Sequence, residues 1–124
     1  MNAEAALRAV LLAHAPLLAA VPAARICIDA VPPKTATPYI AFSLQNSAPE
    51  WSSNNTPLGE VNTIDVQVVG GAPDLQGRST AIAVRELVKA ALLAGGQPWA
   101  GTTAAYDDAL DLEVEVVTVD WVTG

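Results

Sequence analysis

The stretch VNTIDVQVV, residues 61–69, decides the fold because apolar and polar side chains alternate along it. A period of two residues is typical of a β-strand with one buried face and one face in water. The stretch PYIAFSLQ, residues 38–45, alternates in the same way. We therefore expect the two stretches to pair as an antiparallel hairpin. Their inward-facing residues are Ile40, Phe42, Leu44, Ile64, Val66 and Val68.

A turn and a helix follow this strand on its C-terminal side. The stretch GGAPD, residues 70–74, is rich in turn residues, and Asp74 is placed to cap a helix that runs to about Ala94. Gly95 and Gly96 should end that helix. Small residues in its apolar stripe predict close packing on the sheet. The stripe consists of Ala81, Val84, Val88, Ala91 and Leu92.

A helical stretch and a short strand precede the hairpin. Apolar residues recur at helical spacing from Leu7 to Val21. Pro16 should kink or split this helix, and Pro22 should end it. The stretch RICID, residues 25–29, predicts a short strand.

The C-terminal stretch LDLEVEVVTVDWV, residues 110–122, predicts a long strand whose inward phase changes partway. Its apolar residues fall on one face up to Val116 and on the other from Val117 onward. This change predicts a bulge, or a strand end that is covered on its other side. Together, the elements predict a single α+β domain over residues 1–124, with two helices packed on one face of an antiparallel sheet.

The composition excludes several classes of protein. An apolar content of 52% excludes a disordered chain, and the net charge of −7 argues against a nucleic-acid-binding surface. One cysteine permits no internal disulfide. The apolar N-terminal run is broken by His14 and Pro16 and carries Glu4 before Arg8, so we interpret it as a helix and not as a signal peptide or membrane span.

The motifs that could carry chemistry are incomplete. The stretch VQVVGGAPDLQGRST lacks the first glycine and the lysine of a phosphate-binding loop. His14 has no second metal ligand three or four residues away, so we expect a partly buried, hydrogen-bonded structural residue. Cys27, between two isoleucines, should be a small buried residue. Asp107, Asp108 and Asp111 should form a solvated acidic turn. We expect no catalytic residue, no metal and no cofactor.

The segment SAPEWSSNNTPLGE, residues 47–60, predicts a long polar hairpin loop with an aromatic anchor. A loop longer than its strands require more often serves function than folding. Tryptophan among adaptable polar residues is the composition of contact surfaces. We therefore predict partner contacts in this loop and at apolar residues that lie off the buried helix stripe or near the C-terminus. These are Trp51, Ser52, Ser53, Asn54, Asn55, Ile82, Leu93 and Trp121.

The stretch RICIDAVPPKTATPYIAFSL resembles the opening of the small tail-completion proteins of long-tailed bacteriophages, also called tail terminators. The polar hairpin loop, the strand and turn DVQVVGGAPD, the alanine-rich helix and the final strand match that family in order. The last strand departs from the family, which often has an arginine or tyrosine pattern there. The residues that carry the resemblance are Arg25, Ile26, Pro32, Pro38, Tyr39 and Ile40.

The resemblance implies a virion structural protein without enzymatic activity. Such proteins form rings, usually hexamers, that cap the head-proximal end of the tail tube, end its growth and help join the tail to the head. The implied partners are other copies of the chain, the tail-tube protein and a head-completion or connector protein. DNA would pass through the lumen without specific binding, and no membrane is involved. The implied location is the head–tail interface of the virion, after assembly in the host cytoplasm.

Two other classes of function stay open at this point. A soluble ligand-binding or regulatory α+β module would use the long loop as a lid. A small hydrolase would use the acids of YDDALD with a metal ion.

Overall fold

The structure is a computed structural model, and it describes most of the 124-residue chain. The described residues are 3–28, 36–51, 57–71, 75–96, 99–107 and 112–123. The elements are α1 (Ala3–Leu12), α2 (Ala15–Ala20), the 3₁₀ turn η1 (Ala23–Arg25), β1 (Ile26–Ile28), β2 (Tyr39–Trp51), β3 (Pro57–Gly71), α3 (Leu75–Ala94), β4 (Trp99–Asp107) and β5 (Leu112–Thr123).

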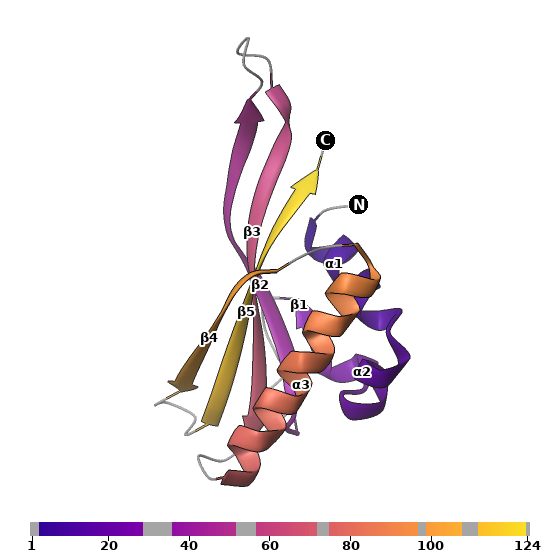
Figure 1. The fold of residues 1–124 in the computed structure, drawn as a ribbon, viewed down its shortest axis with the longest axis vertical. Helices are drawn as coiled ribbons and strands as arrows, with labels where there is room; N and C mark the ends of the chain where they lie inside the picture. The colour runs from indigo at the N-terminus through magenta and orange to yellow at the C-terminus, as the bar shows by residue number, and fades with distance from the viewer. Residues whose placement is uncertain are drawn as a thin grey trace.

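The five strands form one sheet in the order β1-β2-β3-β5-β4. The helices lie together on one of its faces, where α3 crosses the strands diagonally beside α1 and α2 (Figure 1). The α+β class is therefore confirmed. The sheet is not purely antiparallel, because β1 pairs with β2 in parallel while the other three pairs are antiparallel.

The first helix is split in two, one of the outcomes predicted from Pro16. Helix α1 ends at Leu12, and α2 begins at Ala15 with the proline in its first turn. Proline is tolerated there because the amide hydrogen that it lacks has no partner within the helix. The break turns the chain, so that both short helices pack against α3 and the sheet.

The predicted alternation in the hairpin matches burial in the sheet. Phe42 pairs with Val66, and Val66 pairs with Val117, so the three side chains share the helix-covered face. The whole predicted stripe of α3 is buried. A side chain at Gly70 would collide with the backbone of Gly77 and Ala81, so glycine permits the close approach of α3. Leu44 departs from the prediction with an exposure of 42%.

The phase change in β5 arises from cover on both faces and not from a bulge. The pairing of β5 with β3 runs without a register shift from Val114 to Thr123. Val117, Val119 and Trp121 face the helices, and Val114 faces the opposite side. There it belongs to a second buried cluster with Tyr39 and Val69, packed against Leu112 and Val116.

The sequence analysis missed one strand and misplaced the boundaries of one loop. Strand β4 was not predicted, because its small residues carry little periodicity and it forms by pairing with β5. The predicted loop at 47–60 is mostly strand, since β2 continues to Trp51 and β3 begins at Pro57. Its residues pair across the hairpin, for example Ala48 with Val61. Backbone pairing needs no alternation of side chains where no core covers the strands.

Candidate functional site: the hairpin arm, the sheet edges and an apolar groove

The far ends of β2 and β3, residues 46–51 and 57–62, form an arm that projects beyond the helices (Figure 1). The side chains of residues 46–48 are exposed. The pairing of the two strands shifts register between Leu44 and Asn46, and again between Glu50 and Trp51. Bulges of this kind bend and twist a hairpin and redirect its far end. The arm is therefore an extension of the sheet outside the helix-covered core.

Side-chain hydrogen bonds fix the base of the arm to β5. Asn62 is 4% exposed, and its Nδ2 donates to the carbonyl oxygen of Trp121 at 3.0 Å. Ser47 Oγ donates to Asn62 Oδ1 at 2.8 Å. Thr63 Oγ1 donates to Asp120 Oδ1 at 3.1 Å on the other face. Because a buried amide is costly to leave unpaired, these bonds set the direction in which the arm leaves the sheet.

The predicted contact residues fall in different places. The backbone of Trp51 is at the end of the arm, paired with Pro57, and residues 52–55 lie outside the described residues. Leu93 is 60% exposed near the end of α3, and Ile82 is half-buried. The expectation of an apolar surface at Trp121 is wrong, since its side chain is 8% exposed within the main core. The inward phase of β5 carries it under the helices.

The sheet has two edges that no described strand covers. Strand β1 pairs only with residues 40–42 of β2, which leaves the outer edge of residues 43–51 without a partner among the described residues. The described part of the chain likewise offers no partner for the outer edge of β4. Leu44 and Thr103 are exposed at these edges. An open edge presents backbone donors and acceptors that can pair with another chain.

The residues of β4 make that edge unusually open to pairing. Natural edge strands are commonly protected by lysine or proline. Strand β4 contains neither, and its first charged residue is Asp107 at its end. This edge was missed from the sequence, although two threonines between flanking aromatic residues are a weak strand signal.

The positive charges of the described residues lie away from the face of the sheet opposite the helices. Within the described residues, every arginine and lysine lies on the helices or in η1: Arg8, Arg25, Arg78, Arg85 and Lys89. The face opposite the helices, here called the open face, carries Asp65 and Asp120 on its central strands. Thr118 Oγ1 donates to Asp65 Oδ1 at 3.0 Å. The described open face is thus neutral to acidic.

Ion pairs hold α3 against β5. The guanidinium of Arg85 forms two ion pairs. Its Nη2 lies 2.7 Å from Glu86 Oε1, and its Nη1 lies 3.4 Å from Oε2 of Glu115, a residue that is 3% exposed. The hydrogen bond to Glu86 raises the pKa of Arg85, and the same bond lowers the pKa of Glu86. Arg78 lies 3.8 Å from Glu113 farther along β5. The contacts of Arg78 and Arg85 with β5 hold α3 against the sheet. Both arginines thus have carboxylate partners within the subunit.

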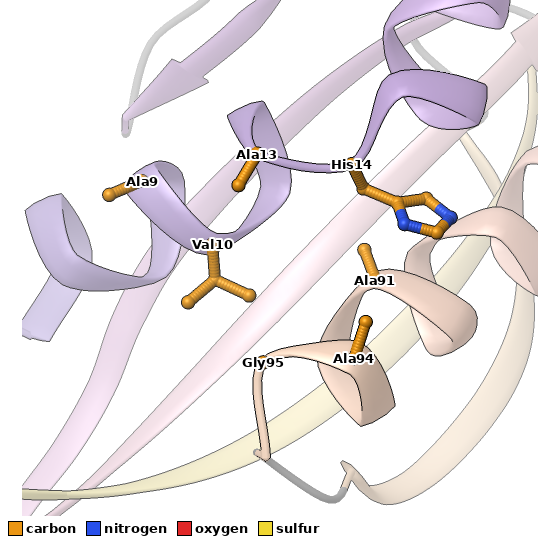
Figure 2. A pocket seen from close by; sticks show the side chains of 7 residues that line it. All are labelled: Ala9, Val10, Ala13, His14, Ala91, Ala94 and Gly95. Atoms are coloured by element: carbon orange, nitrogen blue, oxygen red, sulfur yellow. The ribbon is translucent and has the colours of Figure 1, made fainter.

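An apolar groove of about 360 Å³ separates α1 from the C-terminal end of α3 (Figure 2). His14 is its one residue with a titratable side chain, and the ring extends toward Ala91. His14 is half-buried, as predicted, at the break between α1 and α2. The expected hydrogen bond from its ring is not made to any described residue. The lining residues are Ala9, Val10, Ala13, His14, Ala91, Ala94 and Gly95.

The described residues contain no cluster of three or more histidine, cysteine, aspartate or glutamate side chains that could hold a metal ion. Cys27 was expected to be buried, but its side chain is only half-buried. Asp108 and Asp111 of the acidic turn lie outside the described residues. Within the described chain, helices long and apolar enough to cross a membrane are absent.

Comparison with known proteins gives one family and one fold. The model of the family described as "Tail completion protein gp17" matches residues 5–124. No curated protein matches the chain. A chain in a solved structure described as "Virion of native gene transfer agent (GTA) particle" has the same fold, with a TM-score of 0.61 and 21% identity. The match covers 98% of this chain and 95% of that chain.

Proposed function

Because the chain belongs to the family of tail completion proteins gp17, we propose that it caps the head-proximal end of a tail tube as a ring. Family membership makes it a structural protein of the virion tail. In the finer role proposed here, the ring ends tube growth and presents a surface to the head. The match over residues 5–124 is the observation that carries this proposal.

The proposed partners follow from the same role. They are further copies of the chain, six in the complete ring, the tail-tube protein below and a head-completion or connector protein above. The protein would act at the head–tail interface, after assembly in the host cytoplasm. The related fold in a gene transfer agent virion supports a place among assembled virion proteins.

The arm and the charge distribution support this role. The arm lies outside the helix-covered core, which suits contacts to a neighbour or to the tube. The open face has no arginine or lysine among its described residues, so it would not retain a phosphate backbone that moves past it. The described ion pairs are satisfied within the subunit, which suits a structural role and not an enzymatic one.

Electron microscopy of tail tubes tests the proposal. Tubes assembled with the protein should have uniform length and extra density at one end, while tubes assembled without it should vary in length. Tubes that continue to grow with the protein present, and that carry no end density, would refute the proposed function.

A ligand-binding module is the second candidate, because the groove volume falls within the range of small-molecule sites. Two observations would favour this function: a stable monomer whose melting temperature rises when an apolar ligand is added, and no binding of that monomer to tail tubes.

A further inference from the structure

We propose that the ring is closed by a continuous β-sheet, in which the outer edge of β4 in one copy pairs with the outer edge of β2 in the next. This inference rests on the proposed ring and names the surfaces that form it. The occupant of each open edge is thus a second copy of this chain.

The two open edges match in length and in their bulges. Residues 43–51 of β2 and residues 99–107 of β4 each span nine positions. Each contains one extra residue where the pairing to its own neighbour shifts, Gln45 in β2 and Ala100 in β4. Without its extra residue, each edge offers the same number of positions for pairing, here called rows. Alignment over all rows also stops short of residues 40–42, which β1 already occupies.

The direction of the strands fits this contact. Strand β2 is antiparallel to β3, β3 to β5 and β5 to β4, so β4 runs opposite to β2. Rotation about a ring axis leaves the direction of each strand along that axis unchanged. The β4 edge of one copy would therefore meet the β2 edge of the next in the antiparallel sense. Such a head-to-tail contact closes into a ring when the rotation allows it.

The faces of the paired residues also fit, although Pro49 of the β2 edge can accept but not donate a hydrogen bond in the new pairing. With the extra residues Gln45 and Ala100 left unpaired, full overlap places Thr103 of β4 opposite Ala48 of β2. Within the subunit, Thr103 is level with Val116 and Ala48 with Val61, so both belong to the open face. Paired residues must share a face, and a shift by one residue would break this agreement.

The tilt of the strands follows from the same register. Thr103 is level with Ala41 in its own subunit, and Ala48 lies about six rows farther along β2. Six rows of about 3.3 Å give an offset of about 20 Å along the strands for each subunit. Four strands about 4.8 Å apart give a width of about 19 Å across the strands. Because the two lengths are nearly equal, the strands tilt by about 45° from the ring axis. Closed β-barrels have tilts of about 35–45°. The alignment chosen by edge length thus gives a barrel of ordinary geometry.

In this ring, the helices lie outside and the open face lines the lumen. Six copies would contribute 24 strands, four from each copy (β2, β3, β5 and β4). With this strand spacing and tilt, the barrel has a diameter of about 50 Å, measured between opposite backbones. The segregation of the described cations to the helix side supports this orientation, because the lumen wall then carries Asp65 and Asp120 instead. The register supports closure of the ring, and the charge distribution supports its orientation.

Disulfide cross-linking tests the pairing. In a Cys27→Ala background, the variant Ala48→Cys with Thr103→Cys places two exposed positions directly opposite each other across the proposed contact. On tail tubes capped by this variant, oxidation should give covalent multimers up to the closed ring. The matched control carries Ala48→Cys with Thr102→Cys, whose second thiol faces the helix side and should cross-link at least tenfold less.

Each outcome separates this inference from the proposed function. Capped tubes that yield only monomers after oxidation would overturn the continuous sheet and leave the capping role intact. Dimers formed by Thr103→Cys alone would show that β4 pairs with another β4, and would also overturn it. Uncapped tubes with the wild-type protein would instead refute the proposed function.

Discussion

The two halves of the β2–β3 hairpin have the same backbone pairing but different surroundings. In the half beneath the helices, Phe42 and Val66 are buried, and apolar and polar residues alternate. In the arm, residues 46–48 are all exposed, and polar residues fall on both faces. Burial imposes the alternating pattern, whereas pairing alone does not. A long paired hairpin without cover is therefore a feature that folding does not require.

The largest expected effect lies in the covered half. Phe42→Ala should lower the free energy of unfolding by about 3–5 kcal/mol, because it removes a fully buried ring and leaves a cavity. Asn46→Ala is the matched change on the same strand, and it should alter stability by less than about 0.5 kcal/mol. Urea unfolding of both variants measures the difference. Equal losses would show that the arm contributes to the core after all.

The junction between the two halves should give an intermediate effect. Asn62→Ala removes the bonds to Ser47 and to the Trp121 carbonyl, and should cost about 1–3 kcal/mol. It should also reduce tube capping more than that loss explains, because the direction of the arm is no longer fixed. Capping assayed well below the melting temperature separates the two effects. Normal capping by the folded variant would show that the direction of the arm is irrelevant.

Association should respond to salt. Six copies of a chain with a formal charge of −7 would carry −42, and screening reduces this repulsion. We expect the free protein to be monomeric or weakly associated, and to shift toward larger species as salt rises. Sedimentation velocity at low and high salt measures the shift. A stable hexamer at micromolar concentration in low salt would show that the ring forms without help from the tube.

The smallest effect concerns the surface of α3. Arg85 lowers the pKa of Glu86, so the carboxylate contributes stability above its ordinary pKa of 4.5 and loses it as the pH falls through the lowered value. Glu86→Gln should be slightly less stable than wild type at pH 7, and the difference should vanish in acid. Thermal melts of both proteins at pH 7 and pH 3 check this. A difference that persists unchanged at pH 3 would contradict the assigned ion pair.

The sequence predicted the elements whose patterns reflect burial. The stripe of α3 and the alternation around Val66 follow from periodicity, since one face of each packs in the core. Strand β4 and the arm left no such pattern, because their partners are backbone groups far away in the sequence. Trp121 was misplaced although it shares the phase of Val117 and Val119, because the main core under the helices extends along β5 as far as this residue.

Partner contact at the residues named from the sequence stays a prediction, and the sequence indicated only part of the surface described above. Tryptophan among polar residues pointed to the segment that became the arm, and Leu93 is exposed as its position off the stripe required. The segment was taken for a loop, so its open backbone edge was not foreseen. The pairing of that edge with β4 needs the sheet order, and the sheet order follows from tertiary contacts alone.

Replacement of Trp51 to Asn55 by a short Gly-Ser link tests the central claim, that the arm serves association and not folding. Because the closure entropy of a surface connection changes slowly with its length, we expect urea unfolding to shift by less than about 1 kcal/mol. The folded variant should fail to cap tail tubes in the electron microscope. A loss of several kcal/mol on unfolding, or normal capping by a stable variant, would contradict the claim.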